Sequence, residues 1–217
     1  MKLATNSLAA FFLPIATWGF SISPRSPVRQ QSSSALQAGI GIYYDSSTGN
    51  TETCAGYIAD AIGGVSADYI GDATEDEIKN KDALIVGAPT WHTGSDTERS
   101  GTNWDQWLYD KLPNMDLKDK KVAIFCCGDQ ESYSDYYCDA AGELYDCFTK
   151  AGCKVYGATE TEGYNHQASK AEIDGKFCGL MFDEDNQYDL SEDRAQKWVS
   201  QLKEEGFFAA VATEAAN

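Results

Sequence analysis

The chain has 217 residues, a length for which one domain is the default expectation. Hydrophobic residues make up 42% and charged residues 24% of it, which is ordinary globular usage and excludes the apolar-poor composition of a disordered chain. The net charge of −17 argues against nucleic acid or an anionic membrane as the main partner and favours basic partners.

The N-terminal segment differs from the rest of the chain in charge. Residues 1–44 contain no Asp or Glu, and their only basic residues are Lys2, Arg25 and Arg29. Residues 8–16 (LAAFFLPIA) form an apolar run with the length of a secretory signal core. This run is too short to span a membrane, so we expect no membrane insertion.

A second targeting pattern follows. Residues 21–34 (SISPRSPVRQQSSS) are rich in Ser and free of acidic residues, which is typical of a transit peptide. A signal-like segment (1–19) before a transit-like one (20–38) resembles the bipartite presequence of algae with secondary plastids. This resemblance implies that residues 1–38 are removed and that the mature protein lies in the plastid stroma. The alternative is a simple secretory peptide with a Ser-rich linker.

The region after residue 38 alternates short apolar runs with amphipathic helical patterns. The helical patterns are the 51–63 segment, a segment with Tyr137, Ala140, Ala141, Leu144 and Phe148 on one face, and a final helix with Ser191 as N-cap candidate and Ala195, Trp198, Val199 and Leu202 buried. The apolar runs predict strands at 39–45, 66–71, 82–89, 121–129 and 153–158.

This alternation predicts an α/β fold, a doubly wound five-stranded parallel sheet with helices on both faces. We expect the domain to span residues 39–207 and residues 208–217 to form a flexible C-terminal tail. Ligands of such sheets bind at the carboxyl ends of the strands, where the strand order reverses.

The cysteines and histidines predict neither a disulfide framework nor a metal site. The cysteine count is odd, no C-x-x-C pair occurs, and His92 and His166 lack the spacing of zinc ligands. We therefore expect small buried thiols in a reducing compartment. The seven cysteines are Cys54, Cys126, Cys127, Cys138, Cys147, Cys153 and Cys178.

The loop after the first predicted strand has the composition of a phosphate-binding site. Residues 45–52 (DSSTGNTE) place hydroxyl side chains and Gly49 directly before a helix N-terminus, where backbone N–H groups and the helix dipole attract anions. The loop contains no Lys or Arg, and the chain has no Walker A motif, so we do not expect ATP binding by a P-loop. An ordinary Ser/Thr-rich helix cap is the alternative.

Two further loops at the same predicted edge carry aromatic residues. Residues 89–94 (PTWHTG) place Trp91 after a buried strand, and residues 128–133 (GDQESY) place Tyr133 after the next one. Two such rings can enclose a flat ring system by offset stacking, although each alone is typical of a packing surface.

These segments together resemble the flavodoxins, specifically their long-chain photosynthetic type. The motifs are SSTGNTE, PTWHTG, GDQESYSD and GKFCGLMFDEDNQYDL (175–190), and the resemblance covers residues 38–207. It implies the strand order 2-1-3-4-5, for which flavodoxin is itself a standard illustration. Residues 160–180 resemble the insertion that interrupts strand five in long-chain members.

The resemblance implies bound FMN. The phosphate would lie on residues 46–51, the isoalloxazine ring between Trp91 and Tyr133, and its pyrimidine edge against Asp129 and Gln130. The full expected set is Ser46, Ser47, Thr48, Gly49, Asn50, Thr51, Pro89, Thr90, Trp91, His92, Thr93, Gly94, Cys127, Gly128, Asp129, Gln130, Tyr133 and Asp135. Two departures from the family affect the ring site, namely Cys126-Cys127 before Gly128 and the long segment 95–102 (SDTERSGT).

The resemblance and the charge together predict a low-potential one-electron carrier. A site without cations in an acidic chain disfavours an anionic hydroquinone, so the semiquinone/hydroquinone couple is the one expected to operate. In the family a peptide after the stacking Trp turns over during reduction, and here its position is His92-Thr93. Acidic residues near the ring, among them Asp96, Glu98 and Asp135, are expected either to steer basic partners or only to solvate the surface.

The resemblance also implies partners. Photosystem I would be the electron donor and ferredoxin-NADP reductase the acceptor, with a monomeric protein that replaces ferredoxin under iron limitation. We expect an electron-transfer protein and not an enzyme. The alternatives are a flavodoxin-fold NAD(P)H-dependent quinone reductase and a cofactor-free signalling module of the same fold.

Overall fold

The protein is described here by a computed structural model that covers residue 1 and residues 39–209. The predicted presequence, apart from its first residue, and residues 210–217 of the predicted tail lie outside the described residues. Phe208, which the tail prediction includes, is buried and packs edge-on against Phe207 with 5.1 Å between ring centroids. The packed domain therefore extends at least to Phe208.

The sheet is parallel and has the predicted order β2-β1-β3-β4-β5. Its strands are β1 (Ile40–Tyr44), β2 (Ala67–Tyr69), β3 (Ala83–Pro89), β4 (Lys121–Cys127), β5 (Lys154–Tyr156) and β8 (Leu180–Phe182).

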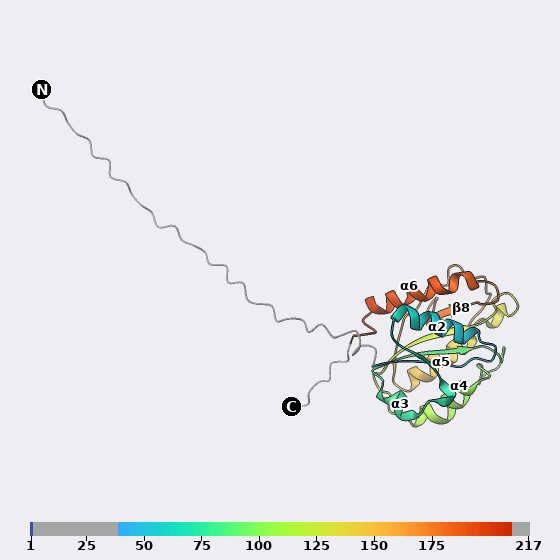
Figure 1. Cartoon of the computed structure of the whole chain (residues 1–217). Coiled ribbons are helices and arrows are strands. Elements are labelled where there is room, and N and C mark those ends of the chain that lie inside the picture. The colour runs from blue at the N-terminus through green and yellow to red at the C-terminus, as the bar shows by residue number, and fades with distance from the viewer. Residues whose placement is uncertain (2–38, 210–217) are drawn as a thin grey trace. The chain divides into compact units, whose positions relative to one another are not determined.

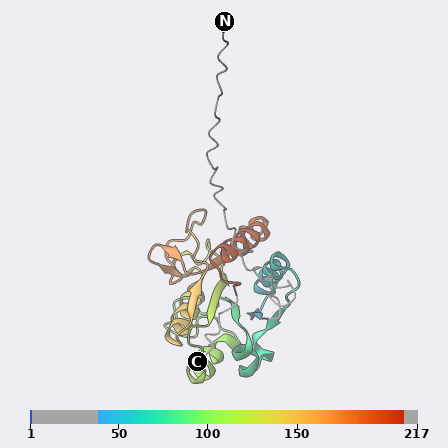
Figure 2. The ribbon, with the colours of Figure 1, turned by 90° about the vertical axis from the view of Figure 1, so that its left-hand side faces the viewer.

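Strand five is split into two pieces, as the resemblance implied. β5 pairs with the first half of β4 and β8 with its second half, from Phe125 to Cys127. The intervening chain carries a small antiparallel pair, β6 (Glu172–Ile173) and β7 (Lys176–Phe177). This insertion (orange in Figure 2) lies at the edge of the sheet.

Helices cover both faces of the sheet (Figure 1). α2 (Asn50–Ile62) and α6 (Ser191–Glu204) pack on one face, against residues such as Ile42, Ile85 and Phe182. The other face is covered by α3 (Glu75–Asn80), α4 (Asn103–Gln106) with a π-helical turn at Trp107–Lys111, and α5 (Asp139–Lys150).

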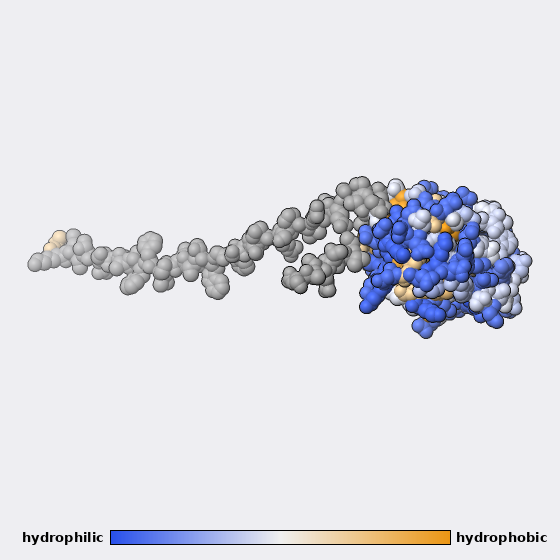
Figure 3. Space-filling model, turned by 90° about the horizontal axis from the view of Figure 1, so that it is seen from below, coloured by the Kyte–Doolittle hydropathy of each residue, from blue (hydrophilic) through white to orange (hydrophobic). Residues whose placement is uncertain are grey.

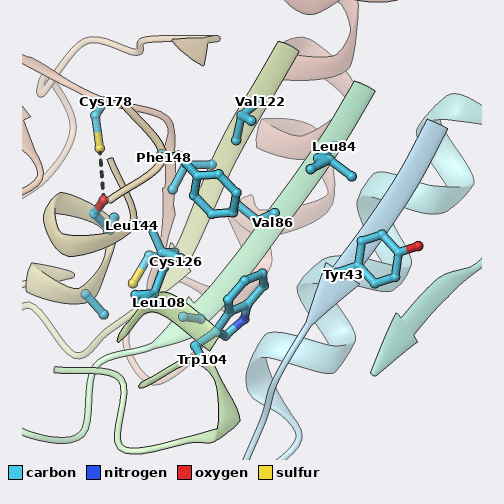
Figure 4. Close-up of a cluster of buried hydrophobic side chains, with 14 of the residues drawn as sticks. Tyr43, Leu84, Val86, Trp104, Leu108, Val122, Cys126, Leu144, Phe148 and Cys178 are labelled. Carbon is cyan, nitrogen blue, oxygen red and sulfur yellow. Dashed lines mark hydrogen bonds between the residues drawn. The ribbon is translucent and has the colours of Figure 1, made fainter. Parts of the chain in front are cut away.

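The core on the α4 and α5 face is closely interlocked (Figure 4). Trp104 of α4 meets Phe148 of α5 edge-on at 6.2 Å between ring centroids, and both pack over Val86 and Val122 of the sheet. The Trp104 indole N–H donates to the Gly87 carbonyl at 2.7 Å, so its polar atom is satisfied inside the core. This core fixes α4, which follows the 95–102 segment.

Several local predictions differ from the structure. Ser191 is the first residue of α6 and not its N-cap, because its hydroxyl donates to the carboxylate of Glu184. Tyr137 is buried but precedes α5, whose N-cap is Cys138. Helices α3 and α4 were not predicted, although α3 begins at a capping box formed by Thr74 and Glu77.

The seven cysteines are free thiols, six of them buried, as the composition predicted. Burial raises the pKa of Cys153 to about 11 and that of Cys178 to about 12. These thiols are therefore protonated at neutral pH and behave as small apolar groups.

The surface is mainly hydrophilic. Figure 3 shows a face dominated by hydrophilic residues with small hydrophobic patches, as expected for a chain with a net charge of −17. None of the helices in the described ranges has the length and apolar character that a bilayer-spanning helix requires.

Candidate functional site: a cleft at the carboxyl ends of the strands

Four strands end at one edge of the sheet. Tyr44 is paired with Gly87, and Pro89 is paired with Cys127, which is paired in turn with Phe182. The loops that follow these strands enclose a cleft of about 400 Å³, within the range of small-molecule sites. Its lining is Thr48, Asn50, Thr51, Pro89, Thr90, Trp91, Thr93, Cys127, Gly128, Asp129, Tyr133, Glu184 and Asp185.

The hydroxyl-rich loop at one end of the cleft is held by a buried carboxylate. Asp45 is 3% exposed and accepts hydrogen bonds from the Ser46 N–H at 2.7 Å and from the Asn103 N–H at 2.8 Å and side-chain amide at 3.0 Å. The Ser46 hydroxyl in turn accepts the Gly49 N–H at 2.9 Å. Because Asn103 opens α4, Asp45 joins the loop to the opposite side of the sheet edge.

The N-terminus of α2 points unpaired donors at the cleft. Gly49 is its N-cap with φ 95°, a left-handed conformation that glycine adopts without strain, and no side chain caps the helix. Within the described ranges, the backbone N–H groups of Thr48, Asn50 and Thr51 have no protein acceptor. Unpaired N–H groups at a helix N-terminus bind anions, so this end suits a phosphate.

Two aromatic side chains stand at the other end of the cleft. Trp91 is 48% exposed and Tyr133 is 53% exposed, although large aromatic residues usually bury most of their surface. Both rings line the cleft, and within the described residues neither stacks on another aromatic ring. This arrangement leaves their faces available to a flat ligand.

The backbone around Trp91 is held by a neighbouring segment. The N–H groups of Trp91 and His92 both donate to the carbonyl of Arg99 at 3.1 Å. The next residues form a turn in which the Ser95 N–H donates to the His92 carbonyl at 3.2 Å and Gly94 has φ 78°. The His92 ring contacts the Glu98 carbonyl through Nδ1 at 2.6 Å and does not line the cleft.

The loop after β4 is organised by Asp129. Its carboxylate accepts the N–H groups of Glu131 at 3.0 Å and Ser132 at 2.8 Å and the side-chain amide of Asn186 at 2.9 Å. Burial alone opposes its ionisation, but these hydrogen bonds outweigh burial and lower the pKa of Asp129. The group is therefore ionised at neutral pH.

The cleft is acidic. Its described lining contains Asp129, Glu184 and Asp185 and neither Lys nor Arg. Burial, followed by the nearby charges of Asp129 and Asp183, raises the pKa of Asp185, which indicates a negative local field. A negative charge that develops on a ligand in this cleft is therefore disfavoured.

Eleven of the eighteen predicted residues line the cleft. Gln130 does not: it is buried, its side-chain N–H donates to Asp183 at 2.7 Å, and its side-chain oxygen accepts the Asn165 N–H at 2.6 Å. Asp135 is exposed in a turn outside the cleft. The other predicted residues outside the lining are Ser46, Ser47, Gly49, His92 and Gly94.

Glu184 and Asp185 line the cleft but were not predicted as site residues. Both follow β8, so the acidic run D-E-D after the interrupted strand is the signal that could have found them. Among the described residues, no group of three or more His, Cys, Asp or Glu side chains is arranged to hold a metal ion.

A doubly wound sheet with an anion-binding helix terminus and two free aromatic faces at its carboxyl edge defines a protein for a flat, phosphate-bearing ligand. The sequence model of the Flavodoxin family matches residues 42–198. The chain therefore belongs to the flavodoxin family.

Individual relatives agree with this assignment. A flavodoxin of Haemophilus influenzae is 41% identical over 176 residues, which covers 80% of this chain and 98% of that protein. A flavodoxin of Picosynechococcus is 43% identical over 167 residues, which covers 76% of this chain and 95% of that protein. The crystal structure of Fusobacterium nucleatum flavodoxin bound to flavin mononucleotide is similar with a TM-score of 0.68 at 30% identity, over 76% of this chain and 97% of that one.

Proposed function

We propose that this chain binds FMN in the cleft and works as a low-potential carrier of single electrons. The observation that carries the proposal is the pairing, in one cleft, of an uncapped helix N-terminus with two half-exposed aromatic rings. FMN supplies an isoalloxazine ring that accepts and releases electrons one at a time.

The phosphate would be held without a basic side chain. Backbone N–H groups of Thr48, Asn50 and Thr51 and the hydroxyls of Thr48 and Thr51 are the donors that line the cleft at this end. A neutral donor set leaves the phosphate charge uncompensated, which adds to the negative field of Glu184 and Asp185.

The ring would lie between Trp91 and Tyr133, with Thr93, Gly128 and Asp129 beside it. The carboxylates in the lining oppose a second negative charge on the ring, which lowers the potential at which the last electron enters. A shift of about 59 mV in a one-electron couple corresponds to about 1.4 kcal/mol. Modest interactions in this cleft are therefore sufficient to set the potential.

The proposed donor is photosystem I and the proposed acceptor is ferredoxin-NADP reductase, in the plastid stroma. The support is the acid-free, Ser-rich character of residues 1–38 and the net charge of −17, which favours basic docking faces. Identity alone does not favour these partners, because a Haemophilus flavodoxin and a Picosynechococcus flavodoxin are about equally similar to the chain.

A reductive titration tests the electron-carrier proposal. The purified protein with one FMN per chain is reduced stepwise while its visible absorption is recorded. We expect two resolved one-electron steps, the second at a lower potential than that of free FMN. A single two-electron step at the potential of free FMN would contradict the proposal.

Enzyme assays separate the proposal from the quinone reductase alternative. A reductase has to hold a nicotinamide over the ring, usually with help from a partner subunit. We expect the protein alone to show no steady NADPH oxidation with a quinone, and to pass electrons only when ferredoxin-NADP reductase is added. Sustained turnover by the protein alone would favour the enzyme.

A further inference from the structure

The segment 95–102, hereafter the clamp segment, folds back over the backbone of Trp91 and His92. The Arg99 carbonyl accepts both of their N–H groups at 3.1 Å, and the Glu98 carbonyl contacts the His92 ring nitrogen Nδ1 at 2.6 Å. The loop that carries Trp91 (residues 89–94) thus makes three hydrogen bonds to the carbonyl groups of Glu98 and Arg99, two consecutive residues of the clamp segment.

The clamp segment itself is held by one buried carboxylate. Glu143 of α5 is 3% exposed, and its two oxygens accept the Glu98 N–H and the Arg99 N–H, each at 2.7 Å. The Tyr109 hydroxyl also donates to it. Because one carboxyl group accepts the N–H groups of two consecutive residues, Glu143 is the main anchor of residues 98 and 99.

Arg99 closes the clamp segment on itself. Its guanidinium donates to the Ser95 carbonyl at 3.0 Å and to the Asp96 carbonyl at 2.8 Å. The far end of the segment is tied to the start of α4, where the Ser100 hydroxyl donates to Asp105 at 2.6 Å. The segment is therefore a closed loop, and its Glu98 and Arg99 carbonyls face Trp91 and His92.

We propose that Glu143 is a positioning residue for the flavin ring site. It holds the clamp segment, the clamp segment holds the backbone of Trp91 and His92, and Trp91 is thereby set for ring binding before the flavin arrives. This inference rests on the proposed function. Glu143 does not line the cleft, so its effect is transmitted through hydrogen bonds and not by contact with the ligand.

The chemistry of the carboxylate makes a specific variant informative. Glu143→Gln keeps the size of the side chain but replaces one acceptor oxygen by an NH₂ group. That group would face one of the two backbone N–H donors at positions 98 and 99, so one of the two bonds is lost and a donor is left opposite a donor.

Flavin binding to the apoprotein is the measurement, with FMN and riboflavin as two probes whose fluorescence is quenched on binding. Because Glu143 acts on the ring end only, Glu143→Gln raises the dissociation constants of FMN and riboflavin by the same factor, about tenfold. In a Trp91→Ala background, Glu143→Gln raises either dissociation constant by less than about twofold, because the Trp91 ring that Glu143 positions is absent.

The control is Tyr109→Phe, which removes the third donor to Glu143 and leaves both backbone bonds in place. We expect it to change either dissociation constant by less than about twofold. If Glu143→Gln does not fold, Arg99→Lys replaces it, because a lysine cannot reach both the Ser95 and Asp96 carbonyls in the fork geometry of arginine. We expect Arg99→Lys to raise the dissociation constants of FMN and riboflavin by the same factor, a few-fold.

Three results would overturn the assignment of Glu143. They are an unchanged affinity in folded Glu143→Gln, a loss of FMN binding without loss of riboflavin binding, and an undiminished effect in the Trp91→Ala background. Failure of the unsubstituted protein to bind either flavin is a different result, since it contradicts the proposed function and not the role of Glu143.

Discussion

The two ends of the cleft are built in different ways. At the phosphate end, the donors are backbone N–H groups of one short stretch, and Gly49 and the start of α2 set their direction within a few residues. At the ring end, Trp91 depends on Arg99, which depends on Glu143, 44 residues further along the chain. The phosphate end is therefore mostly local, apart from the contact of Asp45 with Asn103, whereas the ring end relies on a chain of tertiary contacts.

This contrast has consequences for changes at each end. A local site tolerates distant substitutions but not a change in its own loop. A site that depends on distant contacts can be weakened by a residue that never touches the ligand. The two ends should therefore respond differently to FMN, which has a phosphate, and to riboflavin, which has the same ring and no phosphate.

The largest effect is expected for Asp45→Ala. It removes the buried acceptor of three hydrogen bonds, which come from the half-buried Ser46 and from Asn103 at the start of α4. We expect the free energy of unfolding to fall by about 3 kcal/mol and FMN affinity to fall more than riboflavin affinity. Urea unfolding and the two flavin titrations measure this, with exposed Asp116→Ala as the control. An equal loss of affinity for FMN and riboflavin would contradict the assignment of Asp45 to the phosphate end.

The next effect is expected for Trp91→Ala and Tyr133→Ala. Each removes one face of the ring site, and stacking of an aromatic side chain on a flat ring contributes about 1–3 kcal/mol. Both flavins should therefore lose about tenfold or more in affinity. Tyr188→Ala is the matched control, since Tyr188 is 68% exposed and does not line the cleft. Comparable losses for Tyr188→Ala would exclude a specific stacking role.

A smaller effect concerns pH and Asp139, the first residue of α5. Burial raises the pKa of Asp139, and the Lys170 N–H and the charges of Arg99 and Lys170 offset this only in part. A raised folded pKa means that the stability from this group is complete below its unfolded pKa and is lost as pH rises through the folded pKa.

Asp139→Asn should therefore stabilise the protein relative to the unsubstituted chain as pH rises from about 4 to 7, by on the order of 1 kcal/mol. Urea unfolding of both proteins across this range gives the difference directly. A stability difference that shrinks or reverses toward pH 7 would show that Asp139 is better compensated than its environment indicates.

The smallest effect is expected for His92→Gly. It removes the contact of the ring nitrogen Nδ1 with the Glu98 carbonyl and gives the 92–93 peptide more conformational freedom. We expect the two one-electron midpoint potentials to move apart by about 20 mV, which corresponds to about 0.5 kcal/mol. The peak fraction of one-electron-reduced protein would then rise. An unchanged or smaller peak would remove the 92–93 peptide from the redox step.

The parts of the fold that rest on local patterns were predicted well. The run at 83–89 is apolar throughout because β3 is buried on both faces, and the pattern of α6 places Ala195, Trp198 and Leu202 in the core. One prediction failed because a side chain outside the helix intervenes. Ser191 was expected to cap α6, but the carboxylate of Glu184 takes its hydroxyl.

The candidate site follows the same division. Residues 48–51 could be predicted because their donors and helix are contiguous in the chain. The place of Gln130 could not, because Asp183 and Asn165 turn its side chain away from the cleft. Glu143 shows no signal of its own in the sequence, since its contacts with residues 98 and 99 exist only after α5 packs on the sheet.

Titration of the apoprotein with FMN tests the central claim most directly. We expect one FMN per chain, with quenched fluorescence and an affinity for FMN higher than that for riboflavin, because the α2 terminus contributes to FMN alone. Folded protein that binds no flavin, or that binds FMN and riboflavin equally well, would contradict the account of this cleft.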